Sequence, residues 1–312
     1  MNSTPHIFDT ALRRKRRERA AKRCAKTGAA FFTRRCAEDT ADRLQDIARQ
    51  FEQALIIAPP EFWPLVCAQL PESKIPKNVI FCYDAADAQS CDAKPAIAAK
   101  DDALPFKANS FDLVISILNL HGVNDVPGAL SNIAHVLRPD GLMLSAVFGG
   151  ATLSQLRQSF YRIESAQHGG LSPRVAPMID FSQCAALLQR AAFALPVVDT
   201  DRFTLSYDAL AKLTADLRDS AQTNTMVERG RAPLSASFMR ALETDLMASS
   251  PAKTSARTKT STGDKHAPRF EITFEILWMT GWSPHKDQQK PLKPGSAKMR
   301  LAEALGVKEQ KL

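Results

Sequence analysis

The chain has 312 residues, of which 45% are hydrophobic and 24% are charged. These are ordinary values for a globular protein, and they exclude a wholly disordered chain, a collagen and a disulfide scaffold. No stretch approaches the roughly 18 consecutive apolar residues of a membrane-spanning helix, so no transmembrane segment is predicted.

Almost all of the net charge of +8 lies near the N-terminus. Residues 1–36 hold eleven Lys and Arg but only two acids, whereas the rest of the chain is close to neutral. This basic N-terminal arm fits a solvated helix, a docking surface for an acidic partner, or a segment for cleaved targeting or nucleic-acid binding. No aromatic residues interleave with its charges, so stacking on nucleic-acid bases is not favoured.

The six cysteines include no Cys-x-x-Cys pair, and no histidine stands at zinc-ligand spacing. The sequence therefore predicts no metal site. Scattered thiols of this kind are typical of a reducing compartment, where they stay reduced.

Hydrophobic spacing predicts the elements in chain order. A first amphipathic helix is predicted over residues 37–54, with Leu44, Ile47 and Phe51 on one face. Short apolar runs bounded by turn residues are typical of strands covered on both faces, and they span 54–58, 78–83, 95–99, 111–118 and 142–148. Helical patterns follow over 126–137, 152–167 and 182–192.

The last third of the chain has a different pattern. Residues 270–278 alternate apolar and polar side chains, which predicts an edge or antiparallel strand, with 202–207 as its partner. Residues 249–269 lack large apolar side chains and are predicted to form a disordered loop, and the tail 285–312 is basic and polar. Residues 37–284 are predicted to form an α/β domain with a mostly parallel, seven-stranded sheet and an antiparallel C-terminal strand.

Three sequence blocks occur in a distinctive order: LPFKANSFDLVIS at 104–116, LHGVND at 120–125 and LRPDG at 137–141. They resemble the second half of a class I S-adenosylmethionine-dependent methyltransferase. The resemblance implies the Rossmann-like fold of that superfamily and binding of S-adenosylmethionine. In such a sheet the ligand lies beyond the carboxyl ends of the strands, where the strand order reverses.

Four further blocks narrow the resemblance to one branch: IFDTALRRKRR at 7–17, FGGATL at 148–153, GGLSPR at 169–174 and MTGWSPH at 279–285. They are similar to the mitochondrial complex I assembly factor that acts as an arginine hydroxylase and to its alphaproteobacterial homologues. The biotin-pathway malonyl-carrier methyltransferase is a more distant relative. The resemblance implies a protein substrate or assembly partner linked to complex I.

The resemblance also bears on location. The basic segment begins where the family's folded domain begins, so no transit peptide is expected before it. A bacterial cytoplasmic protein is therefore expected, or one on the matrix side of the mitochondrion in a eukaryote.

The loop after the first strand departs from the family. The family pattern D-x-G-x-G-x-G would place an acid at Ile56 and glycines at Ala58, Pro60 and Phe62. Glycine lets the backbone turn tightly and approach the methionine part of the cofactor, whereas proline fixes φ and has no N–H to donate. Phe62 and Trp63 are expected to place bulk near the pocket.

Acidic residues elsewhere are candidates for holding the cofactor. Asp84 follows the second strand, where the family often has an acid that binds the ribose hydroxyls. Asp87 is an alternative candidate for this role. Lys100 stands where the family has an acid near the adenine. The adjacent Asp101 and Asp102 are the candidates to replace that acid.

The resemblance also places Ala58, Leu104 and Asn119 against the cofactor and makes His121 the candidate catalytic residue. The tryptophan that follows this histidine in the family is replaced here by Gly122.

Three functions therefore stay open. The first is an enzyme using S-adenosylmethionine, either a methyltransferase or an arginine hydroxylase of the family type. The second is a non-catalytic assembly factor that kept the fold and lost cofactor binding. The third, suggested by the basic arm, is a nucleic-acid methyltransferase or binder. The sequence determines neither the oligomeric state nor whether the protein contacts a membrane peripherally.

Overall fold

The computed structural model describes residues 6–83, 96–98, 103–168, 170–249 and 269–288. The strands are β1 (Gln53–Ile57), β2 (Asn78–Tyr83), β3 (Ala96–Ala98), β4 (Phe111–Ile117), β5 (Leu137–Phe148), β6 (Ala194–Tyr207) and β7 (Phe270–Trp282). The α-helices are α1 (Thr10–Thr27), α2 (Phe31–Asp46), α3 (Phe62–Cys67), α4 (Val126–Val136), α5 (Ser154–His168), α6 (Phe181–Arg190), α7 (Leu210–Asp219) and α8 (Ala236–Ser249). Short 3-10 turns are η1 (Glu72–Lys74) and η3 (Leu120–Gly122).

The seven strands form one sheet in the order β3-β2-β1-β4-β5-β7-β6. Strands β1 to β5 run parallel, and β7 lies antiparallel between β5 and β6. This arrangement confirms the predicted mostly parallel, Rossmann-like sheet. The strand order reverses between β1 and β4, so the crevice for a ligand is expected at their carboxyl ends.

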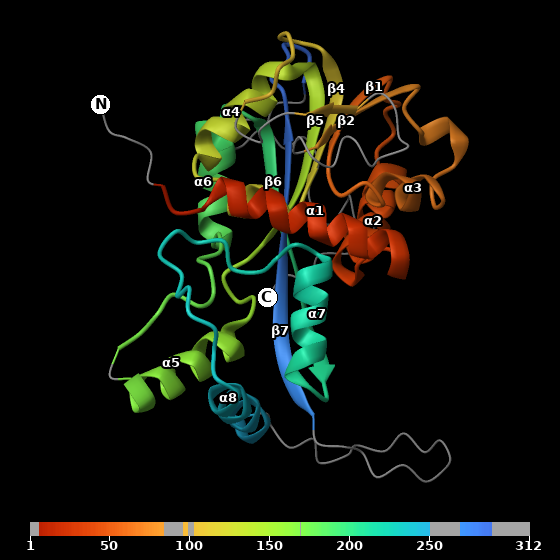
Figure 1. Cartoon of the computed structure of the whole chain (residues 1–312). Coiled ribbons are helices and arrows are strands. Elements are labelled where there is room, and N and C mark those ends of the chain that lie inside the picture. Colours follow the sequence, from red (N-terminus) through yellow and green to blue (C-terminus); the bar gives the residue numbers. More distant parts are fainter. Residues whose placement is uncertain (1–5, 84–95, 99–102, 169, 250–268, 289–312) are drawn as a thin grey trace, which may run out of the picture.

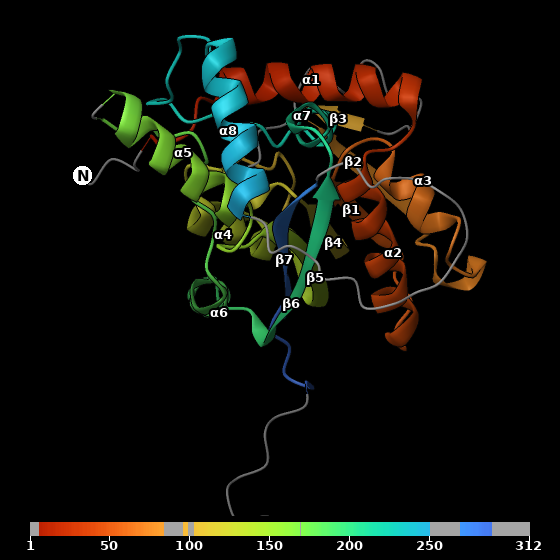
Figure 2. The same cartoon turned by 90° about the horizontal axis from the view of Figure 1, so that it is seen from below.

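The strands contribute alternate side chains to two apolar layers. On β4, Leu113 and Ile115 belong to the layer that includes α2 and α3, whereas Val114 belongs to the layer that includes α4 and α6. Figure 1 shows α4 and α6 on one side of the sheet and α2 and α3 on the other. Helices α5 and α8 pack against each other away from that part of the sheet (Figure 2). Because helices cover both faces of the sheet, the sequences of the central strands are continuously apolar.

Within the ranges that the structure describes, no helix has both the length and the apolar character needed to cross a membrane. The interior of the predicted loop 249–269 and most of the predicted tail 285–312 lie outside the described residues.

The first predicted helix is displaced along the chain. It was expected over 37–54, but α2 spans Phe31–Asp46, and Ile47 after it is extended, with φ −80° and ψ 119°. The buried face of α2 begins at Phe32, and the chain then needs extended residues to reach β1. The predicted boundary between residues 36 and 37 therefore falls inside a helix that joins the basic segment to the sheet.

Strand β7 pairs with β6 along its whole length, from Tyr207 opposite Phe270 to Ala194 opposite Trp282. The predicted pairing of 202–207 is confirmed, and the strand extends back to Ala194. Strand β6 is the edge of the sheet, and Arg35 of α2 binds Asp201 on it through two hydrogen bonds of 2.6 and 2.8 Å. Charged groups on an edge strand discourage pairing with another chain.

The acid of the SFDLV block has a structural role. The Asp112 carboxylate is 5% exposed and accepts hydrogen bonds from the backbone N–H groups of Glu52 and Gln53, both at 2.9 Å. These donors lie at the start of β1, next to β4 in the sheet. Asp112 therefore fixes where the two strands that border the crevice begin.

We expect Asp112→Ala to lower the free energy of unfolding by about 2–4 kcal/mol, because it leaves two backbone donors without their acceptor. Asp112→Asn keeps one acceptor oxygen and should lose less. Urea unfolding measures both, with Asp287→Ala as the control, since that side chain is 73% exposed. Equal stability of Asp112→Ala and the control would contradict this role.

Candidate functional site

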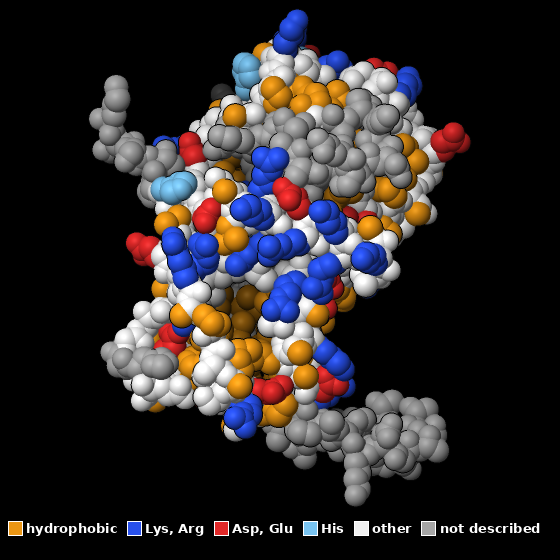
Figure 3. All heavy atoms as spheres, viewed as in Figure 1, with side chains coloured by type: hydrophobic (Ala, Val, Ile, Leu, Met, Phe, Trp, Pro, Cys, Tyr) orange, Lys and Arg blue, Asp and Glu red, His pale blue; other side chains and the backbone are white. Residues whose placement is uncertain are grey.

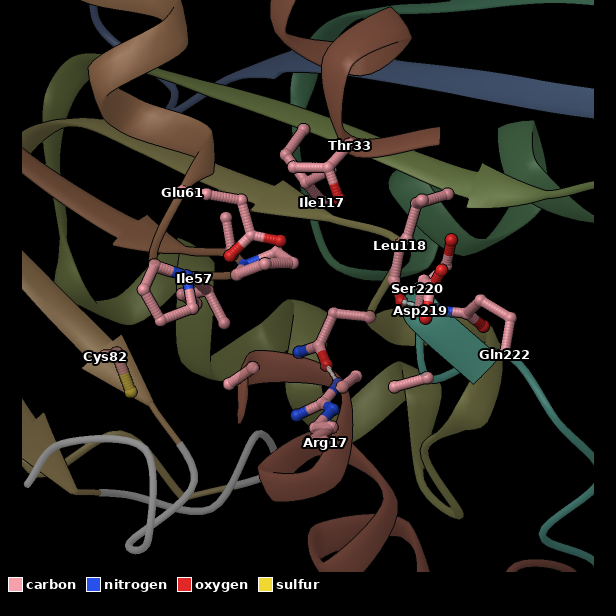
Figure 4. A pocket seen from close by; sticks show the side chains of 17 residues that line it. Arg17, Thr33, Ile57, Glu61, Cys82, Ile117, Leu118, Asp219, Ser220 and Gln222 are labelled. Carbon is pink, nitrogen blue, oxygen red and sulfur yellow. Dashed lines mark hydrogen bonds between the residues drawn. The ribbon is translucent and has the colours of Figure 1, made fainter. Parts of the chain in front are cut away.

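A cavity lies at the carboxyl ends of β1 and β4, where the strand order reverses (Figure 4). Its empty volume is about 610 Å³, the open mouth included. Apolar walls with a few polar groups are typical of a site for a small organic ligand. The described residues that line it are Arg17, Ala20, Ala21, Thr33, Ile57, Ala58, Pro59, Pro60, Glu61, Cys82, Ile117, Leu118, Asn119, Asp219, Ser220, Ala221 and Gln222.

Helix α1 forms one wall of this cavity. Arg13, Arg17, Ala20 and Cys24 recur at helical spacing and therefore lie on one face, which points inward. The opposite face is offset by two residues and carries exposed cations: Lys15, Arg19, Lys22 and Lys26. Figure 3 shows Lys and Arg side chains gathered in a band over this helix. The basic arm thus has an inner face that belongs to the site and an outer face in solvent.

The two ends of α1 are fixed to the rest of the chain. At its start, the Phe8 N–H donates to Asn124 Oδ1 at 2.8 Å, and Asn124 Nδ2 donates to Phe8 O at 3.0 Å. Asp9 caps the helix by accepting from Leu12 N at 2.9 Å. Near its end, Arg23 pairs with Asp219 at 2.5 Å. The wall of the cavity is therefore held in place by the loop after β4 and by the end of α7.

Asn119 links α1 to the end of β4. It is 2% exposed, and Arg13 Nη2 donates to both its main-chain oxygen and its Oδ1, at 2.6 Å each. Arg17 also donates to Oδ1. The preceding Leu118 has φ +49°, a left-handed conformation that costs a side-chain residue energy and is common at functional sites. Asn119 Nδ2 is buried and has no hydrogen-bond partner among the described residues. An acceptor atom on a ligand would satisfy this donor.

The loop after β1 lines the cavity with Ala58, Pro59, Pro60 and Glu61. Phe62 is fully buried and Trp63 is 6% exposed, both within the core layer that includes α2. Neither side chain is among the residues lining the cavity, although both directly follow the lining residue Glu61. Helix α3 begins at Phe62, and this helical turn directs the two aromatic rings into the core.

A second cavity adjoins the first. Both are lined by Arg17, Leu118, Ala221 and Gln222, and the second extends to Leu153, Leu156, Val175 and Met178. His121 lies in the second cavity and is 8% exposed. A ligand in the first cavity and a group in the second would therefore meet near Leu118 and Gln222.

Both ring nitrogens of His121 are engaged. Nδ1 accepts from the Phe148 backbone N–H at 3.3 Å, and Nε2 lies 2.8 Å from Gln222 Oε1. These contacts require a neutral ring with its hydrogen on Nε2. Burial, together with the nearby Arg13 and Arg17, lowers the pKa of His121 to about 4, although the hydrogen bond with Gln222 opposes this shift. Gln222 in turn donates to Leu118 O at 3.1 Å, so His121 supports the turn at the end of β4.

Gly122 makes room for Arg13. A Cβ at this position would lie 3.0 Å from Arg13 Nε and 3.3 Å from its Cζ. A side chain at this position would press on the guanidinium that binds Asn119. The loss of the family's tryptophan is thus matched by a buried arginine from α1.

The structure brings together only part of the predicted site. Ala58 and Asn119 line the first cavity and His121 the second. Leu104 packs against the core layer that includes α4 and is not among the lining residues. Asp84, Asp87, Lys100, Asp101 and Asp102 lie outside the described residues.

The polar cavity residues Arg17, Glu61 and Gln222 are among those that the sequence did not identify as part of the site. Arg17 stands in the basic segment, and its spacing from Arg13 and Ala20 at four and three residues was the available signal. No pattern pointed to Gln222. In the part of the chain that the structure describes, no three His, Cys, Asp or Glu side chains gather as metal ligands.

Comparison with known proteins identifies the family. Residues 79–145 match the methyltransferase domain family. The human mitochondrial arginine-hydroxylase NDUFAF5 is 32% identical over 306 residues, which cover 96% of this chain and 84% of that protein. The chain belongs to the NDUFAF5 arginine-hydroxylase family.

More distant relatives match parts of the chain. The malonyl-[acyl-carrier protein] O-methyltransferase of Xylella fastidiosa is 37% identical over 126 residues, 40% of this chain and 41% of that enzyme. The solved structure of the YcgJ protein from Bacillus subtilis has a TM-score of 0.48 and 13% identity, covering 80% of this chain and 98% of that one. The methyltransferase domain at residues 79–145 and the similarity to human NDUFAF5 make the chain a member of the S-adenosylmethionine-dependent methyltransferase superfamily.

We expect stability to depend on pH through His121. Its pKa is about 4 in the folded protein and about 6.5 in an unfolded chain, so the unfolded state binds the proton first as the pH falls. The free energy of unfolding should fall by up to about 1.4 kcal/mol per pH unit between about pH 6.5 and pH 4. The pH slope should be smaller in His121→Gln and unchanged in His135→Gln, an exposed control. Equal slopes in wild type and His121→Gln would contradict a buried neutral ring.

Proposed function

We propose that the chain binds S-adenosylmethionine in the crevice between β1 and β4 and acts on a protein substrate linked to respiratory complex I. The observation that carries this proposal is the similarity to human NDUFAF5 over nearly the whole chain. The cavity at the reversal of strand order supports it, because doubly wound sheets bind their ligands there.

The described residues fit such a ligand. Ile57, Ala58, Ile117 and Leu118 supply apolar walls, and the buried Nδ2 of Asn119 supplies a donor that lacks a partner among the described residues. Asp84, Asp101, Asp102 and Leu104 remain sequence-based candidates for the ribose and adenine. When bound, the cofactor supplies an electrophilic methyl group on a sulfonium.

His121 then acts as a positioning residue. Its two nitrogens hold Phe148 N and Gln222, and Gln222 holds the carbonyl of Leu118, which lies between the two cavities. A neutral ring with both nitrogens engaged orients these groups and excludes water. The substrate side chain would enter the second cavity, which shares Arg17, Leu118, Ala221 and Gln222 with the first.

The relatives named NDUFAF5 are mitochondrial proteins. We place this chain in the compartment where complex I is assembled, either the bacterial cytoplasm or the mitochondrial matrix.

Titration calorimetry with S-adenosylmethionine and S-adenosylhomocysteine tests the cofactor. We expect both to bind in the micromolar range and ATP to give no heat, because phosphates need N–H donors that Pro59 and Pro60 lack. A well-folded protein that binds neither adenosyl ligand would overturn the proposal and favour the non-catalytic assembly factor.

The substrate is tested by mass spectrometry on complex I purified from cells lacking this protein and incubated with it. A subunit should gain one methylene if the reaction is methylation. If it is hydroxylation, a subunit should gain one oxygen atom when molecular oxygen and a two-electron reductant are added to the incubation. The control omits the adenosyl cofactor. No mass change on any subunit would count against an enzymatic role on this complex.

A further inference from the structure

Glu61 places a carboxyl group at the wall of the first cavity. It follows the two prolines of the loop after β1 and precedes α3, with φ −73° and ψ −13°. Figure 4 shows its side chain extending toward the open space, with Arg17 of α1 across from it. Glu61 is partly buried and belongs to the residues that line the cavity.

The Glu61 carboxyl is partly buried, and Arg17 across the cavity donates a hydrogen bond to Asn119 Oδ1. Burial raises the pKa of Glu61, and hydrogen bonds from its own backbone N–H and from the Cys24 thiol oppose that rise. Among the described residues, no cation contributes to this shift. A buried carboxylate is costly unless it is paired. A cationic group on a ligand would supply the pairing.

The position of Glu61 identifies which part of a ligand it meets. In doubly wound folds a nucleoside lies toward the second strand, and its 5′ substituent lies at the turn after the first strand. Cys82 of β2 lines one part of the cavity, and Glu61 lies in the turn after β1. That turn usually binds phosphate through glycine N–H groups. Here two prolines remove donors and an acid is added, so the turn favours a cationic substituent.

We propose that the Glu61 carboxylate binds the α-ammonium group of the cofactor's amino-acid portion. This inference rests on the proposed function, since it needs S-adenosylmethionine in the crevice. It explains how a turn without glycines still holds the methionine part: an ion pair replaces the missing backbone donors. The unpartnered Nδ2 of Asn119 in the same cavity independently indicates a polar ligand there.

Ligand truncation tests the contact directly. S-adenosylhomocysteine carries the α-ammonium group but no sulfonium charge, and 5′-methylthioadenosine carries neither. We expect Glu61→Gln to weaken the binding of S-adenosylhomocysteine by at least about tenfold, because a charge-assisted hydrogen bond is lost. Binding of 5′-methylthioadenosine should change by less than about twofold, since it lacks the group that Glu61 contacts. Glu52→Gln, which removes an acid that is 62% exposed, is the matched control and should change neither.

The pH dependence has a definite sign. The ammonium group binds the ionised carboxylate, so protonation of Glu61 competes with the ligand. Affinity of the wild type for S-adenosylhomocysteine should therefore fall as the pH falls through the raised pKa of Glu61. The dependence should be absent in Glu61→Gln and absent for 5′-methylthioadenosine with either protein.

The outcomes separate the two proposals. If the folded wild type binds neither ligand, the proposed cofactor function fails. If it binds both and Glu61→Gln weakens both equally or neither, the function stands and this inference is wrong. If Glu61→Gln weakens binding of S-adenosylmethionine alone, Glu61 contacts the sulfonium. This result would also overturn the inference about the α-ammonium group. If Glu61→Gln does not fold, Glu61→Asp is used instead, because it keeps the charge. It should weaken the binding of S-adenosylhomocysteine and leave that of 5′-methylthioadenosine unchanged.

Discussion

The buried contact between Arg13 and Asn119 is the interaction on which the site depends. A guanidinium can be buried only where oxygen atoms accept its hydrogens, and Asn119 offers two of them at 2.6 Å. The left-handed Leu118 turns the chain so that Asn119 is available at the end of β4. A helix whose charges would otherwise keep it in solvent is thereby fixed as a wall of the cavity.

Local patterns predicted the sheet well. The apolar runs over 78–83 and 111–118 correspond to β2 and β4, because strands buried on both faces must be continuously apolar. The start of α2 was misplaced, since Arg34 and Arg35 masked a buried face that begins at Phe32. Pairing with β7 extends β6 back to Ala194, and no short-range pattern reports that contact.

The site was harder to predict than the fold. Ala58 and Asn119 follow strands, and strand ends determine where the crevice lies. The direction of Phe62 and Trp63 depends on the helical turn that begins at Phe62, which a residue-by-residue alignment against a glycine pattern does not reveal. The contribution of Arg17 depends on α1 folding back over the sheet, a long-range contact that charge composition alone does not reveal.

Gly122 approaches Arg13 so closely that the residue at one position limits which residue fits at the other. A side chain at 122 and a buried arginine at 13 compete for the same space. A tryptophan at 122, as in the family pattern, requires a different residue or a different side-chain path at 13. The basic segment and the strand-end turn are therefore sterically coupled, although they are far apart in the sequence.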